Sequence, residues 1–326
     1  MLEEFSSKMS LPLLYHAESS FYSQRARLGF AEKGVKHRRY HVTHKAGENL
    51  LPWFMRINPK GEVPVVEHDK RIIIDSEAIL DYLDQIAPEG ARLTPDMSSK
   101  EGAKVHRFKN LLKSVNIGIL MLGSKHHAQE IGAVKVNDFN AWLGHFVKLK
   151  LSKGIRIMKW YSRIYPDLKF AYDAKILTYD KKGGIQLDVL LAEIKHCQEV
   201  FDEIEAQLVQ VIQEFNESAP SSEELPWLCS QTFTIADIFL STILHRLVSI
   251  GLDEKFFRRG TRPHIEAYYQ RVLQRPSFRK TCLYSNRALW ALAIPILKYK
   301  IKRTAPYVSI IGVLGAAFFM YYKHRR

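Results

Sequence analysis

The chain has 326 residues, of which 46% are apolar and 25% are charged, a composition typical of a globular protein with one large or two ordinary domains. Its three cysteines, Cys197, Cys229 and Cys282, are far apart, which argues against a disulfide framework or a zinc site, so no metal is expected. The formal net charge of +14 lies in two blocks, since residues 148–182 and 298–326 each carry +7 and the remainder sums to zero. A neutral body argues against nucleic acid as a partner and favours a membrane surface or an acidic protein.

Short strand-like runs alternate with helical patterns over the first 90 residues. The expected elements are a strand over residues 11–16, a helix over 23–33, a strand over 39–42, a loop with a helix, a hairpin at 63–66 and 72–74, and a helix over 78–86. After a linker over 88–100, the pattern is helical, with an amphipathic helix over 186–215 and a mostly apolar helix over 234–247. Thr234 and Asp237 have the spacing of a helix cap, and we expect the apolar helix to be the buried centre of its domain.

An uncharged apolar stretch covers residues 305–322 and has basic residues on both sides. As a helix it would be ~27 Å long, close to the ~30 Å hydrocarbon thickness of a bilayer. Tyr307, Tyr321 and Tyr322 lie near its ends, where aromatic rings favour the membrane interface. A buried core helix is the alternative, but dense positive charge on both flanks disfavours it. We therefore expect a single C-terminal transmembrane helix.

The position of this stretch close to the last residue predicts insertion after synthesis, which leaves the folded body in the cytosol. Its moderate hydropathy and basic flanks favour the mitochondrial outer membrane, with peroxisomes as the close alternative and the endoplasmic reticulum third. The juxtamembrane segment 288–303 contains an apolar run that is too short to cross a bilayer. It is expected either to lie among the lipid headgroups or to pack on the body.

Four motifs resemble those of glutathione transferases, chiefly of the zeta and tau classes. They are Ser20-Phe-Tyr-Ser-Gln-Arg-Ala-Arg27, Asn58-Pro-Lys-Gly-Glu-Val-Pro64, Ile74-Asp-Ser-Glu-Ala-Ile-Leu-Asp-Tyr-Leu83 and Phe233-Thr-Ile-Ala-Asp237. The resemblance implies an α+β fold, with a thioredoxin-like N-terminal domain over 11–88 and an all-α glutathione-transferase C-terminal domain over 100–284. A basic insertion at 148–184 would interrupt the second domain.

A closer resemblance, over nearly the whole chain, is to the ganglioside-induced differentiation-associated protein 1 family. It is carried by Pro52-Trp-Phe-Met-Arg56, Tyr165-Pro-Asp-Leu168, Pro226-Trp-Leu-Cys229, Leu244-His-Arg-Leu247 and the apolar tail. The resemblance implies a mitochondrial outer-membrane protein that promotes fission, with peroxisomes as a second site and with weak or absent transferase activity. The alternative is an active glutathione transferase that conjugates small electrophiles at the same membrane.

The same resemblance implies a glutathione site, with glutathione as ligand or substrate and no cofactor. Pro64 would be a cis-proline beside Val63, whose backbone would meet the cysteinyl part of glutathione. Asp75 and Ser76 would meet the γ-glutamyl end at a helix N-terminus, although Asp75 is one methylene shorter than the common Glu or Gln. Ser20 would be the catalytic residue, donating a hydrogen bond to the thiolate.

Each of these residues also has a purely structural interpretation. A cis-proline shapes the fold even when nothing binds, and a serine before a helix is often only a cap, as Ser20 or Ser76 would be. The basic insertion is either a solvated charged face or a surface for acidic cytosolic proteins or anionic lipid. A homodimer is left open.

Overall fold

The computed structural model describes residues 10–44, 47–90, 92–133, 154–180, 184–218 and 225–283. The predicted juxtamembrane segment 288–303 and the predicted span 305–322 lie outside these residues. Within the described ranges, no helix combines the length and the apolarity needed to cross a bilayer.

The described elements begin as alternating strands and helices and continue as helices only. Their bounds are β1 (Leu13–His16), α1 (Phe21–Glu32), β2 (Arg38–His41), η2 (Glu48–Leu50), α2 (Pro52–Ile57), β3 (Val65–His68), β4 (Arg71–Ile74), α3 (Ser76–Ile86), α4 (Lys100–Ser114), α5 (Ile117–His126), η3 (Pro166–Leu168), α7 (Lys169–Asp180), α8 (Leu187–Ser218), α9 (Ile235–Ser249), α10 (Asp253–Phe256), α11 (Pro263–Gln274) and α12 (Pro276–Thr281). A further helix covers residues 154–164. The prediction of an α+β protein with a thioredoxin-like domain followed by a helical domain is confirmed.

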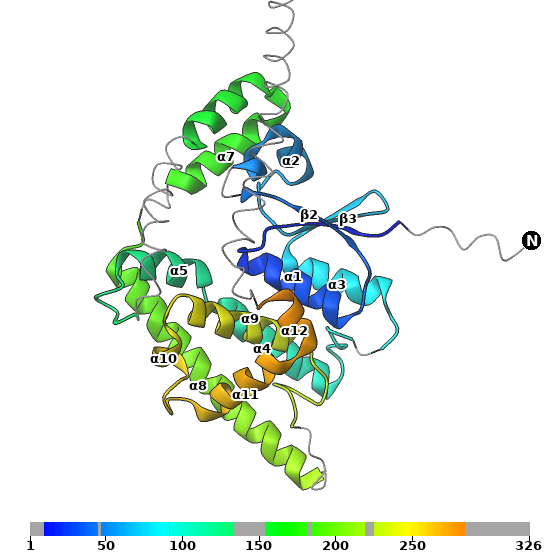
Figure 1. The fold of residues 1–326 in the computed structure, drawn as a ribbon, viewed down its shortest axis with the longest axis vertical. Coiled ribbons are helices and arrows are strands. Elements are labelled where there is room, and N and C mark those ends of the chain that lie inside the picture. Colours follow the sequence, from blue (N-terminus) through cyan, green and yellow to red (C-terminus); the bar gives the residue numbers. More distant parts are fainter. Residues whose placement is uncertain are drawn as a thin grey trace, which may run out of the picture.

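A four-stranded sheet in the order β2-β1-β3-β4 lies between two layers of helix (Figure 1). β1 is parallel to β2 and antiparallel to β3, which pairs with β4 in a hairpin. Leu14 and Val66 are partners across β1 and β3 and belong to the core formed with α1 and α3. The next pair, Tyr15 and Val65, packs with Phe54 of α2 on the opposite face. The alternation of side chains along a strand therefore supplies two separate cores.

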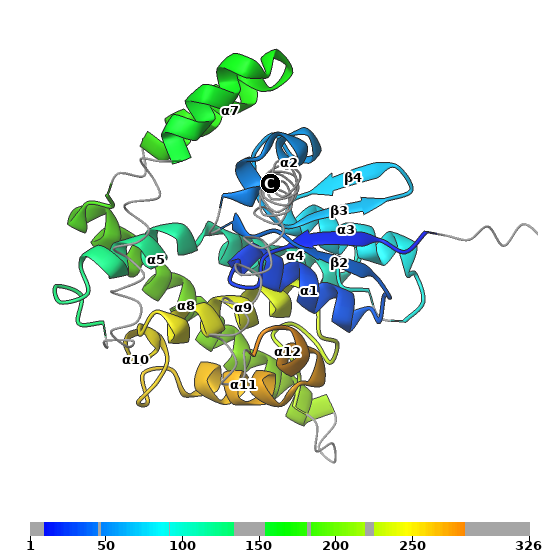
Figure 2. The ribbon, with the colours of Figure 1, turned by 45° about the horizontal axis from the view of Figure 1, so that its top comes forward.

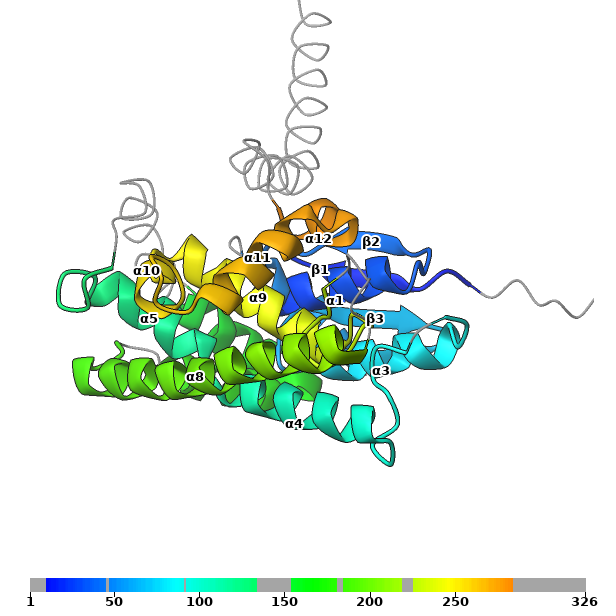
Figure 3. The same ribbon diagram turned by 90° about the horizontal axis from the view of Figure 1, so that it is seen from below.

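The helical domain is built around α9, as the apolar pattern predicts. Most of its side chains are buried, and α4 and α8 lie alongside each other next to it (Figure 3). The predicted cap is confirmed, because Thr234 and Asp237 form a reciprocal capping box. Asp237 also accepts hydrogen bonds from Leu228 N and the Tyr268 hydroxyl, each at 2.8 Å. This carboxylate thus fixes both the start of α9 and the segments packed around it.

The two domains share α1, which packs against α3 in the first domain and against α9 and α12 in the second. Charged pairs cross the same boundary. Glu32 accepts hydrogen bonds from both Nε and Nη2 of Arg275 at 2.7 Å, and Glu77 pairs with Lys109 and Lys113. The domains therefore form one packed body.

Residues 154–180 of the basic insertion form a helical hairpin, composed of helix 154–164, η3 and α7. The hairpin lies beside α2 and apart from α9 (Figure 2). Its own small core contains Met158 and Tyr172 together with Leu50 and Met55 of the first domain. The Tyr172 hydroxyl donates a hydrogen bond to the Leu50 carbonyl at 2.9 Å, and the described part of the insertion is therefore docked on the thioredoxin-like domain.

Two helices begin earlier than the sequence patterns indicated. α1 begins at Phe21 because the Ser20 side chain accepts a hydrogen bond from Ser23 N and caps the helix. α3 begins at Ser76 because its cap is Asp75, which accepts from Glu77 N at 2.8 Å. The interpretation of Ser76 as the cap is wrong, since Asp75 stands one residue ahead with the same capping ability.

Candidate functional site

Ser20 stands at the point where the loop after β1 enters α1. Its backbone is extended, with φ −76° and ψ 124°, and its Oγ accepts from Ser23 N at 3.2 Å. The hydroxyl itself points to the Val63 carbonyl at 3.5 Å, which is the limit of a useful hydrogen bond. The capping role of Ser20 uses an acceptor lone pair and leaves the proton of the hydroxyl available to an anion.

Val63 and Pro64 lie directly before β3, and the peptide bond between them is cis, as the resemblance implied. The 3.5 Å approach of Ser20 Oγ to Val63 O brings together two segments that are 43 residues apart in the chain. The positive end of α1 begins at the same place, and a helix N-terminus stabilises a nearby anion. A thiolate lying here would meet a hydroxyl donor and a favourable helix dipole.

Asp75 and Ser76 occupy the start of α3. Asp75 has φ 84° and ψ 137°, a backbone conformation that L-residues rarely adopt and that tends to persist at functional positions. Its carboxylate caps the helix through Glu77 N, while the Ser76 side chain is buried. The arrangement presents the N-terminus of α3 to an anion, but it engages the Asp75 carboxylate in a backbone hydrogen bond.

Glu77, the next residue, carries a charge that is tightly compensated. Lys109 Nζ lies 2.5 Å from one of its oxygens and Lys113 Nζ lies 2.6 Å from the other. Burial raises the pKa of Glu77, but the hydrogen bonds from the two lysines outweigh burial and hold the pKa below its usual value. The carboxylate therefore stays ionised and ties α3 to α4.

Arg25 is a buried cation in this region, and its sequence context alone predicted no role for it. Its guanidinium carbon lies 4.4 Å from the centre of the Phe21 ring and 3.7 Å from that of Phe239, and its Nε donates to Thr242 Oγ1 at 3.3 Å. Burial lowers the pKa of Arg25 to about 10, while the carboxylates of Asp75 and Glu77 act in the opposite direction. It remains charged at neutral pH and stabilises anions at the start of α3.

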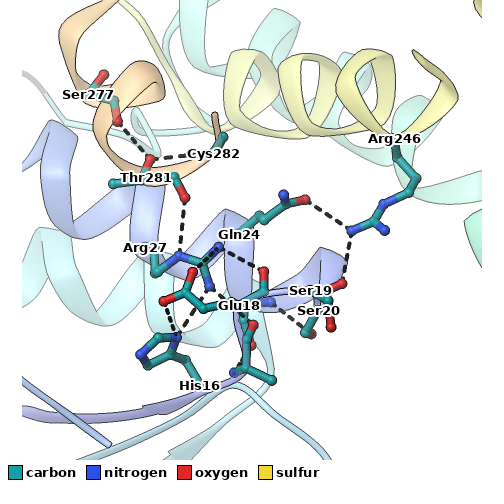
Figure 4. A network of polar contacts seen from close by, with 12 residues as sticks. His16, Glu18, Ser19, Ser20, Gln24, Arg27, Arg246, Ser277, Thr281 and Cys282 are labelled. Carbon is teal, nitrogen blue, oxygen red and sulfur yellow. Dashed lines mark hydrogen bonds and ion pairs between the residues drawn. The ribbon is translucent and has the colours of Figure 1, made fainter. Parts of the chain in front are cut away.

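Arg27 holds the loop that carries Ser20 (Figure 4). Its Nη1 donates to the Ala17 carbonyl and its Nη2 to the Glu18 carbonyl, both at 3.2 Å, while its Nε donates to the Thr281 carbonyl at the end of α12. Arg246 of α9 donates to the Ser19 carbonyl at 3.2 Å. Two arginines from different helices thus fix the loop before α1. The motif Ser-x-x-Ser-x-Arg-x-Arg contained Arg25 and Arg27 and was the signal that could have assigned them.

One trio of metal-ligand type occurs among the described residues, formed by His16, Glu18 and His41, whose ligand atoms lie within 4.8 Å of one another. Arg27 stands in the same place, with Nη1 at 3.3 Å from His16 Nδ1 and Nη2 at 3.6 Å from a Glu18 oxygen. Burial and the charge of Arg27 lower the pKa of His16 to about 2, so the ring is neutral. Because the guanidinium already supplies the positive charge, we assign no metal to this trio.

The three cysteines are buried and unpaired, and none of them belongs to the loop before α1. Burial raises the pKa of Cys282 to about 11 and raises those of Cys197 and Cys229 further. These thiols are therefore poor nucleophiles. The chemistry available near Ser20 is hydrogen bonding to a ligand thiolate.

Comparison with known families identifies both domains. Residues 14–91 match the family described as glutathione S-transferase, N-terminal domain, and residues 188–271 match glutathione S-transferase, C-terminal domain. Among solved structures, the chain is similar to the beta-etherase LigF from Sphingobium, with a TM-score of 0.57 at 20% identity over 83% of this chain and 98% of that chain. It is also similar to Ure2p in complex with glutathione, with a TM-score of 0.55 at 15% identity over 84% and 99% of the two chains. These likenesses establish the fold.

Proteins with similar sequences identify the family more narrowly than the solved structures do. The chain is 31% identical to human (Homo sapiens) ganglioside-induced differentiation-associated protein 1-like 1 over 317 residues, which is 94% of this chain and 82% of that protein. It is 27% identical to glutathione S-transferase TCHQD of Arabidopsis thaliana over 82% of this chain and 88% of that protein. The first match covers both domains, including the basic insertion within the second. The chain therefore belongs to the ganglioside-induced differentiation-associated protein 1 family of glutathione-transferase-like proteins.

Proposed function

We propose that this protein binds glutathione through its transferase-like body and acts at the mitochondrial outer membrane, with its body in the cytosol, to promote fission of the mitochondrial network. The glutathione part of this proposal rests on three segments of the chain that together offer groups for the ligand. The Ser20 hydroxyl, the backbone at Val63 and the N-terminus of α3 come from separate parts of the chain, and Ser20 Oγ lies 3.5 Å from Val63 O. Together they offer a donor for a thiolate, backbone groups for a peptide and a helix end for a carboxylate.

Weak or absent turnover is supported by the geometry of Asp75. Its side chain is short and accepts a hydrogen bond from Glu77 N at 2.8 Å, so reaching toward a ligand amine would give up the cap of α3. Binding energy that is used to break this cap cannot stabilise the transition state. The proposal is therefore a glutathione-binding protein in which conjugation is slow.

The membrane part of the proposal rests on the sequence and on the family. The uncharged stretch 305–322 and the basic block 298–326 have the composition of a transmembrane anchor with basic flanks. Peroxisomes are the second proposed site, as they were from the sequence. A homodimer and acidic cytosolic proteins remain proposed partners.

Glutathione binding is tested by titration calorimetry on the full chain, combined with the ultraviolet absorbance of the bound thiolate as pH is varied. Ser20→Gly removes the hydroxyl donor at little cost to the cap. Because a hydrogen bond to a charged group is worth about 1.5–3 kcal/mol, we expect it to raise the pKa of the bound thiol by about 1–2 units. Ser20→Asp keeps a capping oxygen without a donor and should have at least as large an effect. A wild-type protein that takes up no glutathione would refute the proposal.

An active transferase is the second candidate, and the available Ser20 hydroxyl favours it. Assays with several small electrophiles decide between the two. Conjugation well above the uncatalysed rate that falls about 10-fold or more in Ser20→Gly would establish the enzyme, because the loss follows from a destabilised thiolate. Glutathione binding without turnover leaves the favoured proposal in place.

Anchoring is tested by expressing the full chain in cells and extracting membranes with alkaline carbonate. The wild-type chain should stay with the mitochondrial membrane fraction. Leu314→Asp, which places a charge at the centre of the apolar stretch, should release it, because a charge there costs about 3 kcal/mol in the insertion equilibrium. Leu225→Asp, at an exposed position of the body, is the matched control and should stay bound. Release of the wild-type chain, or mitochondria of normal length after its removal, would contradict the membrane role.

A further inference from the structure

The helical hairpin 154–180 exposes large apolar side chains on both of its helices. The exposed fractions are 45% for Ile157, 56% for Trp160, 43% for Ile164, 87% for Phe170 and 63% for Leu177. Residues i, i+3 and i+7 lie on one face of a helix, so Ile157, Trp160 and Ile164 form a continuous stripe. Phe170 and Leu177 share a face of α7 by the same spacing. These five residues are called the apolar stripe below.

Basic side chains border the apolar stripe. Arg156, Lys159 and Arg163 are exposed and occupy the neighbouring face of helix 154–164, about 100° around the helix axis from Ile157, Trp160 and Ile164. Within the described residues, neither Lys159 nor Arg163 forms an ion pair. The hairpin therefore combines an exposed apolar face with uncompensated positive charge.

An open groove of about 410 Å³ lies between the two helices of the hairpin. It is lined by Lys159, Ser162, Arg163, Pro166, Lys169 and Asp173. The Asp173 carboxylate accepts hydrogen bonds from Ser162 Oγ and Lys169 Nζ, both at 2.7 Å. One acid among three cations leaves the groove positively charged. A phosphate group is the kind of ligand that such a groove attracts.

The positive charge around the apolar stripe restricts what can cover it. Residues 134–153, the stretch of chain directly before the hairpin, carry a net charge of +3, so this stretch is a poor cover. A second copy would bring the same basic groove against this one. An occupant must be apolar at its centre and negative around it. An anionic bilayer has both properties, since acyl chains lie beneath a layer of phosphates.

We propose that the hairpin 154–180 docks on the surface of an anionic lipid bilayer. The apolar stripe lies at the boundary between headgroups and acyl chains, with Trp160 in the interfacial position that its ring favours. Lys159, Arg163 and Lys169 meet lipid phosphates beside it. The inference goes beyond the proposed function, because it gives the folded body a membrane contact of its own and uses neither the tail nor glutathione.

Because the hairpin is docked on the first domain, its contact with a membrane would fix how that domain is oriented. Tyr172 is fully buried and bonded to the Leu50 carbonyl, and Lys175 Nζ lies 2.9 Å from a Glu62 oxygen. Arg56 Nε donates to Asp167 at 3.0 Å. A hairpin held at three points by the thioredoxin-like domain transmits its orientation to that domain. Membrane contact would thus set the orientation of the body on the bilayer.

The test places an environment-sensitive fluorophore on Phe170→Cys in the full chain, where the native thiols are buried. The labelled protein is added to phosphatidylcholine vesicles and to vesicles that also contain phosphatidylserine. We expect a blue shift and brighter emission with the anionic vesicles only, and a loss of both at high salt. Because the label reports residue 170, a tail that binds vesicles does not produce the signal. Adding Leu314→Asp to the labelled chain should leave the shift in place, which separates this inference from the proposed anchor.

Matched variants identify the surface. Lys159→Glu with Arg163→Glu should reduce the partitioning reported by the label at least about 10-fold, because each basic residue at an anionic surface contributes severalfold. Lys195→Glu with Lys255→Glu, two exposed residues of α8 and α10, reverses a like number of charges elsewhere and should have little effect.

The apolar contribution has its own pair of variants. Serine at Ile157, Trp160 and Ile164 should abolish the shift, whereas Val189→Ser with Leu191→Ser on α8 should retain it. Equal shifts with neutral and anionic vesicles, or no shift with either, would overturn the proposal. So would a label that is already shielded without vesicles, which would mean that another part of the chain or a second copy covers the stripe. A shift produced by polyglutamate and not by vesicles would assign the surface to an acidic protein instead.

Discussion

Asp75 makes two opposing contributions to the stability of the protein. Its carboxylate caps α3 through a 2.8 Å hydrogen bond from Glu77 N, while its φ of 84° and ψ of 137° are unfavourable for any residue with a Cβ. The cap is worth about 1 kcal/mol and the strain costs about 1–3 kcal/mol. The residue is therefore placed at this position at a net expense to stability, which is common where a backbone must present its groups to a ligand.

Asp75→Gly and Asp75→Ala separate these contributions. Glycine relieves the strain but loses the cap and makes the unfolded chain more flexible, so its stability should stay within about 0.5 kcal/mol of the wild-type value. Alanine loses the cap and keeps the strain, and should lower the free energy of unfolding by about 1 kcal/mol. Urea unfolding of both variants measures the difference. An alanine variant as stable as the glycine variant would mean that the backbone at residue 75 is not strained.

At the level of secondary structure, the hairpin 154–180 packs on a core of its own. Its core is small and separate from the main core, and it depends on Tyr172, Met158, Leu50 and Met55. Segments with few buried contacts open at a lower free energy than the whole protein. The hairpin should therefore detach locally before the domains unfold.

Tyr172→Ala tests this local stability. Removing a fully buried aromatic ring costs about 3–5 kcal/mol, and here the loss falls on the hairpin. We expect faster amide hydrogen exchange over residues 154–177 and unchanged exchange in α9. Phe170→Ala removes an exposed ring from the same helix and should leave exchange as it was. Faster exchange throughout the protein in Tyr172→Ala would show that the hairpin belongs to the cooperative core.

For the whole molecule, α1 makes the two domains one unit, and each domain contains a histidine whose ring is shielded from water. His16 faces Arg27 of α1, and His245 of α9 lies beside Arg246 and bonds to the Tyr269 hydroxyl at 3.0 Å. Burial, helped by the neighbouring arginine charges, lowers the pKa of His16 to about 2 and that of His245 to about 4. Both rings are neutral in the folded protein.

Stability should accordingly fall as the pH drops below about 6.5. An unfolded histidine takes up a proton near pH 6.5, whereas the folded rings do not until about pH 4 for His245 and about pH 2 for His16. In the window between, the unfolded state binds more protons, so each ring lowers the free energy of unfolding by up to about 1.4 kcal/mol per pH unit. Urea unfolding across pH 4–6.5 measures this slope. His245→Gln should reduce it, and an unchanged slope would rule out a buried neutral His245.

Sequence patterns predicted the parts of the fold that depend on interactions between residues close together in the chain. The capping box at Thr234 and Asp237 and the apolar run of α9 are encoded within a few residues, and both are confirmed. The choice of Asp75 over Ser76 as the cap of α3 was missed because both residue types can cap, and the backbone angle at residue 75 decides between them. The hairpin of β3 and β4 was predicted from its β-branched runs, and its tight turn uses Asp69 and Lys70 at positive φ.

Contacts between segments that are distant in the chain could not be predicted from the sequence. Arg27 bonds to Thr281, which is 254 residues away, and Tyr172 to Leu50, which is 122 residues away. Nothing in the spacing of residues near Arg27 or Tyr172 identifies such partners. The candidate glutathione residues were named through the family resemblance, and their common location follows from the sheet, which sets Val63 beside Ser20. The buried positive charge of Arg25 became evident only once Phe21 and Phe239 were placed around it.

Arg27 joins the last helix described to the loop that carries Ser20, because one guanidinium bonds to both Thr281 and the carbonyls of Ala17 and Glu18. A pull on the chain from beyond residue 281 therefore acts first on α12. From there it reaches α1 at both ends, through Arg27 to the loop that carries Ser20 and through Arg275 to Glu32, so tension at that end is transmitted to the helix that begins beside the candidate site.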